Sequence, residues 1–411
     1  MDTRLIELPN GLRVLYQYAP YTRAVHCGYV INLGSRDDRP EEAGMAHFVE
    51  HMVFKGTAKR KTYHVINYLE SVGGDVNAYT TKEKTCLYAS LGAEYLDRAT
   101  ELLTDIAFRS TFPEKEIFKE QQVIAEEIDM YRNTPDEAIL EDFDQMIFPG
   151  HTLGHPILGT RDTIGTFTQA RLLEHTRQGY AQGRIVYFIA GNVTEKDVRR
   201  VIGKHLLPLE LPPDTLAREA PAAGIELNQQ VRIPTEQAHE ILGGRAFAAG
   251  HPFHTPFQLL NNLLGGPAMN SRLNLNIRER YGLTYNINTF YAPFADSGSW
   301  GVYYACDPDN LARIRGLVQR ELRQCVRAPL GSVGFHQAQR QLIGQFTLSY
   351  EHLLNQMLVA ANDLLDFGTC YSYEEQVAEI ESTTAAQVQE AAALLFHEQE
   401  QALITYLPED A

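Results

Sequence analysis

Alternating and clustered apolar positions divide the first half of the chain into short strands and longer helices. Strands are expected at Arg13–Tyr18, where apolar and polar residues alternate, and at His26–Leu33, where apolar residues run together. Farther along, apolar residues recur with the helical period, and glycines and charged turns separate the elements. We expect helices at Glu41–Phe54, Tyr63–Val72, Ala93–Arg109, Glu114–Arg132, Glu137–Ile147 and Glu195–His205, and strands at Val76–Thr80, Thr85–Leu91 and Ile185–Ala190. This order of strands and helices indicates an α+β fold.

The second half repeats this order after a segment rich in Pro, Glu and Ala, residues 207–234, which we interpret as a linker. The elements expected beyond it are, in order, a strand at His239–Phe247, helices at Pro256–Leu264 and Arg272–Arg280, strands at Thr284–Tyr291 and Ser299–Cys306, four further helices, and a last strand at Gln401–Tyr406. The repeat predicts two homologous domains, 1–206 and 235–411, each with a mixed or antiparallel sheet covered by helices. A chain of 411 residues is long enough for two cores, because single cores stop growing near ~250 residues.

One short motif places metal-binding side chains on a single face of an expected helix. His47 and His51 are four residues apart, so both imidazoles can reach one ion. Glu50 lies at the edge of that face, where it can act as a general base toward a water molecule without ligating the ion. Two histidines at this spacing are, on their own, more often a chance arrangement on a polar helix face. The added Glu50 and the match to the inverted zinc motif His-x-x-Glu-His favour a zinc site.

The expected helix Glu114–Arg132 supplies candidates for the third ligand that catalytic zinc requires. Glu120 and Glu127 are seven residues apart, two turns along one face, so one can ligate zinc while the other supports a histidine. Glu126 points about 100° away, as a solvated acid would. The helix also offers Glu116 and Asp129 as candidates.

A second pair of histidines has the same spacing. His151 and His155 are four residues apart, but Gly154 and Pro156 disfavour a helix there. We therefore interpret this pair as loop residues and not as zinc ligands.

Several blocks of the sequence, in order, resemble the pitrilysin and mitochondrial-processing-peptidase family of inverted-motif zinc peptidases. The likeness spans most of the chain and is closest to short, single-subunit bacterial members. The blocks are Gly34-Ser35-Arg36, Gly44-Met45-Ala46-His47-Phe48-Val49-Glu50-His51-Met52-Val53-Phe54-Lys55-Gly56-Thr57, Asn77-Ala78-Tyr79-Thr80, Val123-Ile124-Ala125-Glu126-Glu127-Ile128, Thr235-Glu236-Gln237-Ala238-His239, Ser271-Arg272-Leu273 and Ile277-Arg278-Glu279-Arg280-Tyr281-Gly282-Leu283-Thr284-Tyr285.

The resemblance implies one zinc ion per chain, held by His47, His51 and Glu127. It assigns Glu120 as the acid that supports a histidine, and Glu50 as the catalytic base. It also implies that the two domains have the processing-peptidase fold and form half of a clam-like chamber.

By the same resemblance, Arg278 and Tyr285 of the metal-free second domain donate hydrogen bonds to the substrate. Read without the family, they would be an exposed helix arginine and a strand tyrosine packed in the core. Residues matching Asn77 and Ala78 hold the substrate main chain, which would add as a strand beside Val76–Thr80. The alternative is that Val76–Thr80 is an internal hairpin strand with no free edge.

Composition indicates which partners and which cellular compartment to expect. The net charge is −16, which disfavours nucleic acid as a partner, and no apolar run approaches the ~20 residues of a spanning helix. The N-terminus has no basic leader before an apolar stretch. Five scattered cysteines are typical of reduced thiols. We therefore expect a cytoplasmic protein that binds neither nucleic acid nor membrane.

The function expected is that of a zinc metalloendopeptidase that hydrolyses extended or unfolded peptides. Because the chain carries both the zinc motif and the Arg278/Tyr285 motif, a homodimer is the preferred assembly. A heterodimer with a metal-free homologous subunit is the alternative. The competing functions are a catalytically silent structural subunit and a peptide-binding subunit of a larger complex.

Overall fold

A computed structural model describes residues 3–222, 224–397 and 400–409 of the chain. The described residues form two compact units. The first unit consists of Met1–Asp129, His155–Glu219 and Ser349–Ser372, and the second of Met130–Gly154, Ala220–Leu348 and Tyr373–Ala411. Each unit is thus assembled from three segments, whereas the predicted division at 1–206, 207–234 and 235–411 has continuous domains.

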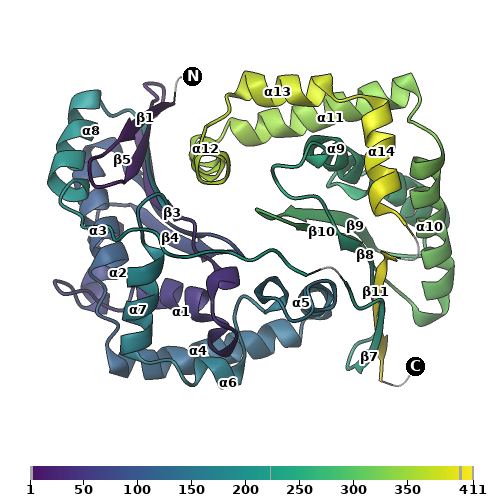
Figure 1. Cartoon of the computed structure of the whole chain (residues 1–411), viewed down its shortest axis with the longest axis horizontal. Helices are drawn as coiled ribbons and strands as arrows, with labels where there is room; N and C mark the ends of the chain where they lie inside the picture. The colour runs from purple at the N-terminus through teal and green to yellow at the C-terminus, as the bar shows by residue number, and fades with distance from the viewer. Residues whose placement is uncertain (1–2, 223, 398–399, 410–411) are drawn as a thin grey trace. The chain divides into compact units, whose positions relative to one another are not determined.

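The first unit is built on a six-stranded sheet in the order β1-β2-β6-β3-β5-β4 (Figure 1). The strands are β1 Arg4–Glu7, β2 Arg13–Tyr18, β3 Ala24–Ile31, β4 Asp75–Thr80, β5 Thr85–Gly92 and β6 Ile185–Gly191. β2 and β6 are parallel, and the other neighbours are antiparallel. β4 pairs with β5 alone among the described strands, so β4 is an edge strand. The helices of this unit are α1 Met45–Met52, α2 Thr62–Glu70, α3 Leu96–Phe108, α4 Glu114–Arg132, α6 Arg161–Ile164, α7 Gln169–Gly179, α8 Glu195–Val201 and α12 Leu353–Phe367.

Both faces of this sheet are covered by helices. Tyr29 of β3 packs in the cluster that contains Leu102 of α3, whereas the next residue, Val30, packs in the cluster that contains Met357 of α12. Since successive side chains of a strand point to opposite faces, α3 and α12 cover opposite sides. Burial on both faces explains why β3 reads as a continuous apolar run in the sequence.

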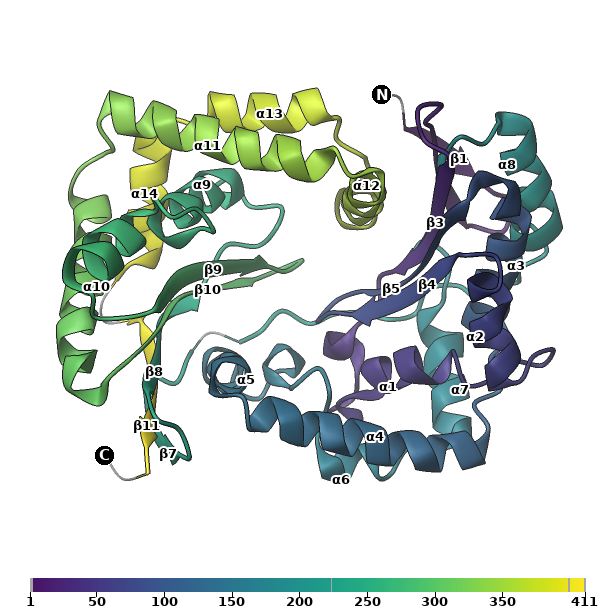
Figure 2. The same cartoon turned by 180° about the vertical axis from the view of Figure 1, so that it is seen from behind.

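The second unit repeats the arrangement with five strands in the order β7-β11-β8-β10-β9 (Figure 2). The strands are β7 Asn228–Ile233, β8 Ala238–Arg245, β9 Asn286–Pro293, β10 Gly298–Cys306 and β11 Ala402–Pro408. Its helices are α5 Pro135–Ile147, α9 His254–Gly265, α10 Leu311–Arg327, α11 Ser332–Tyr350, α13 Tyr373–Ser382 and α14 Ala385–Leu395. The parallel pair β7 and β11 corresponds to β2 and β6. The shared strand order confirms the predicted α+β class with two similar domains.

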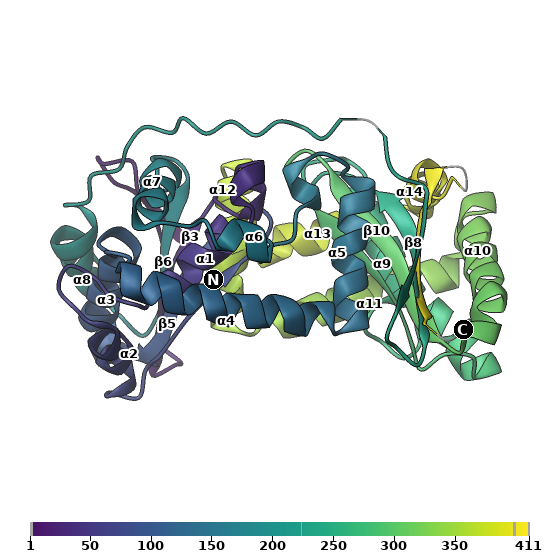
Figure 3. The same ribbon diagram turned by 90° about the horizontal axis from the view of Figure 1, so that it is seen from below.

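Each half of the chain contributes one helix to the sheet of the other half. α4 and α11 are both 19 residues long, and each is followed after a short turn by a helix that crosses over. α5 packs on β8 and β11 of the second unit, and α12 packs on β6 of the first. This exchange is why the compact units are discontinuous in sequence. Figure 3 shows α4 as one long helix.

Several expected elements differ from the structure for local reasons. The helix expected at Glu41–Phe54 begins only at Met45, because Gly44 has a left-handed φ of 94° and interrupts the helical path. The segment 207–234 is not all linker, since it contains β7, which pairs in parallel with β11. The helix expected at Arg272–Arg280 is confirmed, and its middle part, Asn274–Glu279, is π-helical.

Sequence reading also missed whole elements. Among the described residues, five helices and not four follow β10, and neither β1 nor α7 was expected. β1 is short and mostly exposed, and α7 buries few apolar side chains, so both give weak periodic signals. In the part of the chain that the structure describes, none of the helices combines the length and apolar character needed to span a bilayer.

We expect Met357→Ala to lower the free energy of unfolding of the first unit by about 2–5 kcal/mol, because it removes a fully buried side chain of the exchanged helix α12. The matched control is Leu348→Ala on α11, where the side chain is 72% exposed and the expected change is within about 0.5 kcal/mol. Urea unfolding curves of both variants measure the difference. Equal midpoints for the two variants would show that α12 does not stabilise this sheet in solution.

Candidate metal centre

The start of helix α1 is fixed by a buried carboxylate that precedes it in sequence. Asp38 accepts hydrogen bonds from the backbone N–H groups of Gly44 (3.1 Å) and Ala46 (3.1 Å), which the first turn of a helix leaves unpaired. Burial raises the pKa of Asp38, although these backbone donors oppose the shift. Gly44 is required here, because a Cβ would lie 2.5 Å from the carbonyl oxygen of Leu158. The cap and the close approach together set the direction of α1.

Helix α1 presents its two histidines to a glutamate of α4. Nε2 of His47 lies 4.0 Å from Oε1 of Glu127, and Nε2 of His51 lies 3.6 Å from Oε2 of Glu127. The two imidazole centroids are 4.7 Å apart. One ligand atom from each of the three residues falls within 4.8 Å of the other two. The structure therefore brings together the three residues expected to hold zinc.

The donor set and its spacing fit a zinc ion. Zinc takes nitrogen and oxygen ligands at about 2.0–2.2 Å in a tetrahedron, which separates ligand atoms by about 3.4 Å. The distances from the histidine nitrogens to Glu127 are slightly longer than this, so small movements would close the site. Three protein ligands leave one tetrahedral position for water or substrate, as in catalytic zinc sites.

Glu120 lies one step behind this cluster and orients one of the histidines. Nδ1 of His51 is 2.9 Å from Oε1 of Glu120, and Nζ of Lys55 is 2.7 Å from Oε2 of Glu120. The bond through Nδ1 leaves Nε2 of His51 directed at Glu127. This is the supporting position expected for Glu120. Lys55 was not expected, because it lies three residues beyond the end of α1, where helical spacing no longer applies.

The two histidines have different electrostatic surroundings. Burial, with a smaller contribution from the neighbouring His51, lowers the pKa of His47 to about 3, so His47 is a neutral imidazole as a metal ligand must be. Burial also lowers the pKa of His51, but the hydrogen bond to Glu120 and the charges of Glu120, Glu127 and Glu50 outweigh it, and the net shift is upward. In the metal-free protein, His51 is therefore protonated at a higher pH than His47.

Glu50 lies on α1 between the two histidines and reaches strand β4. Its pKa is raised by burial, while a hydrogen bond from the side chain of Thr80 partly opposes the shift. Its Oε2 atom is buried and has no hydrogen-bond partner among the described residues. A carboxylate with a raised pKa and a free oxygen is suited to accept a proton. Thr80, the last residue of β4, gave no separate signal in the sequence beyond the Asn77–Thr80 block.

The expected substrate residues Asn77 and Ala78 lie on the edge strand β4. Asn77 is exposed, and its Oδ1 accepts the backbone N–H of Ala78 at 2.9 Å. Because β4 has no partner strand on its outer side within the described residues, the alternative of an internal hairpin strand is wrong.

Arg278 and Tyr285 lie in the second unit, whereas the metal cluster lies in the first. Arg278 is on the π-helical turn Asn274–Glu279 and donates to Oδ1 of Asn274 at 3.3 Å. Tyr285 immediately precedes β9 and is 85% exposed, so the alternative of a tyrosine packed in the core is wrong.

The remaining candidates lie as expected outside the cluster. His151 and His155 flank a 3₁₀ turn, Thr152–Gly154, and Nδ1 of His151 accepts the backbone N–H of Leu153. Glu126 is exposed on α4. The Asp38 cap was missed by sequence reading, because it lies six residues before Gly44 and outside the usual capping position.

Comparisons with known proteins identify the family of the chain. The sequence model of the Insulinase family (Peptidase family M16) matches residues 13–161, and that of the Peptidase M16 inactive domain matches residues 166–342. The chain is 33% identical to the uncharacterized zinc protease YmxG of Bacillus subtilis, over 95% of this chain and 94% of that relative. It is 31% identical to an uncharacterized zinc protease of Rickettsia bellii, with the same two coverages.

Two solved structures have the same fold. A peptidase M16 inactive domain from Pseudomonas fluorescens superposes with a TM-score of 0.91 at 18% identity, over 99% of this chain and 98% of that chain. A protease from Helicobacter pylori superposes with a TM-score of 0.89 at 18% identity, over 99% of this chain and 100% of that chain. The two matched models and the relatives of more than 30% identity show that this chain belongs to peptidase family M16.

Proposed function

We propose that the protein is a zinc-dependent endopeptidase that hydrolyses extended or unfolded peptides. The observation that carries the proposal is the convergence of His47, His51 and Glu127, with one ligand atom of each within 4.8 Å of the others. The zinc proteases named among the relatives support the same metal. A catalytically silent structural or peptide-binding subunit is the competing function, but it gives no reason for Glu50 to stand beside an intact ligand set.

The proposed chemistry follows from the side chains around the metal cluster. A bound zinc ion supplies Lewis acidity, which polarises a peptide carbonyl and lowers the pKa of water to about 7. Glu50 accepts the proton of the attacking water and later delivers it to the leaving amine. Burial raises the pKa of Glu50 and makes its carboxylate a better proton acceptor. The hydrogen bond from Thr80 holds that carboxylate next to β4.

The peptide would bind by adding a strand to the open edge of β4. Main-chain groups on a free strand edge can pair with an extended peptide of almost any sequence, which gives broad side-chain specificity. Asn77 and Ala78 lie at this edge, and Glu50 is linked to the same strand through Thr80. Arg278 and Tyr285 of the second unit are proposed to donate hydrogen bonds to the substrate within a chamber that two chains enclose.

The assembly proposed is a homodimer with one zinc ion per chain, located in the cytoplasm. Presence of both the zinc motif and the Arg278/Tyr285 motif in one chain supports identical subunits. The cysteines identified as free, Cys27, Cys86, Cys306, Cys325 and Cys370, agree with a reducing compartment. A solution mass of a single chain by light scattering would contradict the dimer.

Glu50→Gln is expected to lower kcat by about 10²–10⁴-fold, because the amide cannot accept the proton of water. Zinc content should stay at one ion per chain, since Glu50 is not a ligand. The matched control is Glu126→Gln, an exposed acid on α4 beside Glu127, which should leave kcat unchanged. Cleavage of an internally quenched peptide and metal analysis measure both. Full activity of Glu50→Gln would rule out the proposed base.

Glu120→Gln is expected to weaken zinc binding by about 10–100-fold, because it removes the carboxylate that orients His51. In the metal-free variant the pKa of His51 should fall, since burial lowers it and the opposing charge of Glu120 is gone. Competition with a chelator gives the zinc affinity, and a histidine NMR titration gives the pKa. An unchanged zinc affinity together with an unchanged pKa of His51 would show that Glu120 does not support the zinc site through His51.

A further inference from the structure

The charged turn between β4 and β5, Lys82-Glu83-Lys84, ties the edge strand to three distant parts of the first unit. Nζ of Lys82 donates to the carbonyl oxygen of His155 at 2.7 Å. Nζ of Lys84 pairs with Asp366 of α12 at 2.7 Å. The carboxylate of Glu83, between them, is buried and binds two arginines. The turn is therefore held in place from several directions.

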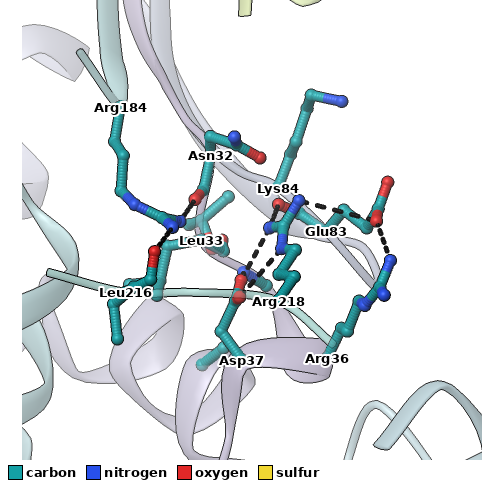
Figure 4. A network of polar contacts seen from close by, with 12 residues as sticks. Asn32, Leu33, Arg36, Asp37, Glu83, Lys84, Arg184, Leu216 and Arg218 are labelled. Atoms are coloured by element: carbon teal, nitrogen blue, oxygen red, sulfur yellow. Dashed lines mark hydrogen bonds and ion pairs between the residues drawn. The ribbon is translucent and has the colours of Figure 1, made fainter. Parts of the chain in front are cut away.

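The linker reaches the same turn through Arg218 (Figure 4). Nε and Nη2 of Arg218 bind the two carboxylate oxygens of Asp37 at 2.9 and 2.7 Å. Nη2 of Arg218 also donates to the carbonyl oxygen of Glu83 at 2.8 Å, and Nη1 lies 3.5 Å from its Oε1. Arg36 binds the same Oε1 at 2.7 Å. A paired arginine contact of this kind fixes geometry as well as charge.

These arginines hold the turn against the segment Gly34–Asp38. The backbone N–H groups of Ser35 and Arg36 donate to the carbonyl oxygens of Thr81 and Lys82 at 3.1 and 2.7 Å. Gly34 packs so closely that a Cβ would lie 2.5 Å from the carbonyl oxygen of Thr81. The two segments therefore behave as one rigid piece, which the buried ion pairs around Glu83 hold together.

This piece contacts the proposed active site at two points. At one end, Asp38 caps the first turn of the metal helix α1. At the other end, Thr80 donates to the carboxylate of Glu50. Displacement of the turn would therefore move the general base and the edge strand relative to the two histidines.

We propose that Arg218 and Glu83 are positioning residues for the peptidase reaction, acting through the Gly34–Asp38 segment on α1 and through β4 on Glu50. The inference rests on the proposed function, which it deepens. Neither residue touches the metal cluster, so their effect is on the geometry of the reaction and not on zinc binding. A misplacement of about 1 Å at a reacting group costs up to about 10²-fold in rate.

Arg218→Ala tests the inference in the full-length, zinc-loaded protein. We expect kcat to fall by about 10–100-fold with KM and zinc content unchanged. Low millimolar guanidinium should restore part of kcat by filling the cavity that the side chain leaves, whereas a merely destabilised fold would gain no activity from it. Glu83→Gln keeps the shape of the side chain and serves as the second variant, with the same expected loss of kcat.

The matched control is Arg184→Ala. Arg184 anchors the same linker through Asp214 at 2.6 Å and the carbonyl oxygen of Leu216 at 2.8 Å, but it does not bind Asp37 or Glu83 (Figure 4). We expect its kcat to match that of the wild type. If Arg218→Ala and Arg184→Ala have the same kcat, the linker is only tethered and the inference is overturned.

Hydrogen–deuterium exchange separates this inference from the proposed function. In Arg218→Ala, exchange should rise at the β4–β5 turn and at the amides of Gly44 and Ala46, and stay unchanged in the second unit. A wild-type protein that cleaves no peptide would refute the proposed function. The exchange pattern would still show whether Arg218 holds the β4–β5 turn and the start of α1 in place. Exchange in Arg218→Ala that equals wild type at both places would refute the inference.

Discussion

The buried carboxylate of Asp38 holds the first turn of the helix on which the proposed zinc site depends. It accepts the N–H groups of Gly44 and Ala46, and the left-handed φ of Gly44 lets the helix begin abruptly against the backbone of Leu158. With its start fixed, α1 presents His47 and His51 to α4 in a single orientation. The hydrogen bond between Glu120 and His51, and the place of Glu50 beside β4, both follow from that orientation.

The two units have similar sheets but differ in metal-ligating side chains. In each unit an edge strand lies next to a helix, β4 beside α1 in the first and β9 beside α9 in the second. Yet within the described residues only the first unit gathers three metal-ligating side chains at one point. Metal chemistry therefore depends on a few residues of α1 and α4. The sheet itself is common to both units, with or without a metal cluster.

The sequence predicted the parts of the molecule that local pattern determines. The expected bounds of α4 and β2 agree with the structure residue for residue, because the helical period of α4 continues over 19 residues and β2 has turns on both sides. Helical spacing predicted that His47 and His51 share one face, and that Glu120 and Glu127 do, while the motif and the family resemblance supplied their roles toward zinc. The exchange of α5 and α12 between sheets was not predicted, because periodicity reports that a face is buried and not which sheet buries it. For the same reason β7 was taken as linker, since its pairing with β11 is a long-range contact.

The residues around the site that sequence reading missed were missed for one reason. Asp38, Thr80 and Arg218 act across turns or between segments that are distant in sequence, where spacing carries no signal. Arg218 in particular lies in a stretch that composition marks as linker, yet it binds both Asp37 and Glu83. Polar networks of this kind are decided by the tertiary structure, so only coordinates bring them together.

The central claim is that His47, His51 and Glu127 hold one zinc ion. Anomalous diffraction at the zinc edge, from crystals of the zinc-loaded protein, tests it most directly. The account predicts one strong peak per chain at about 2.0–2.2 Å from a nitrogen of each histidine and a carboxylate oxygen of Glu127. A peak bound elsewhere, or one that Glu127 does not reach, would contradict it.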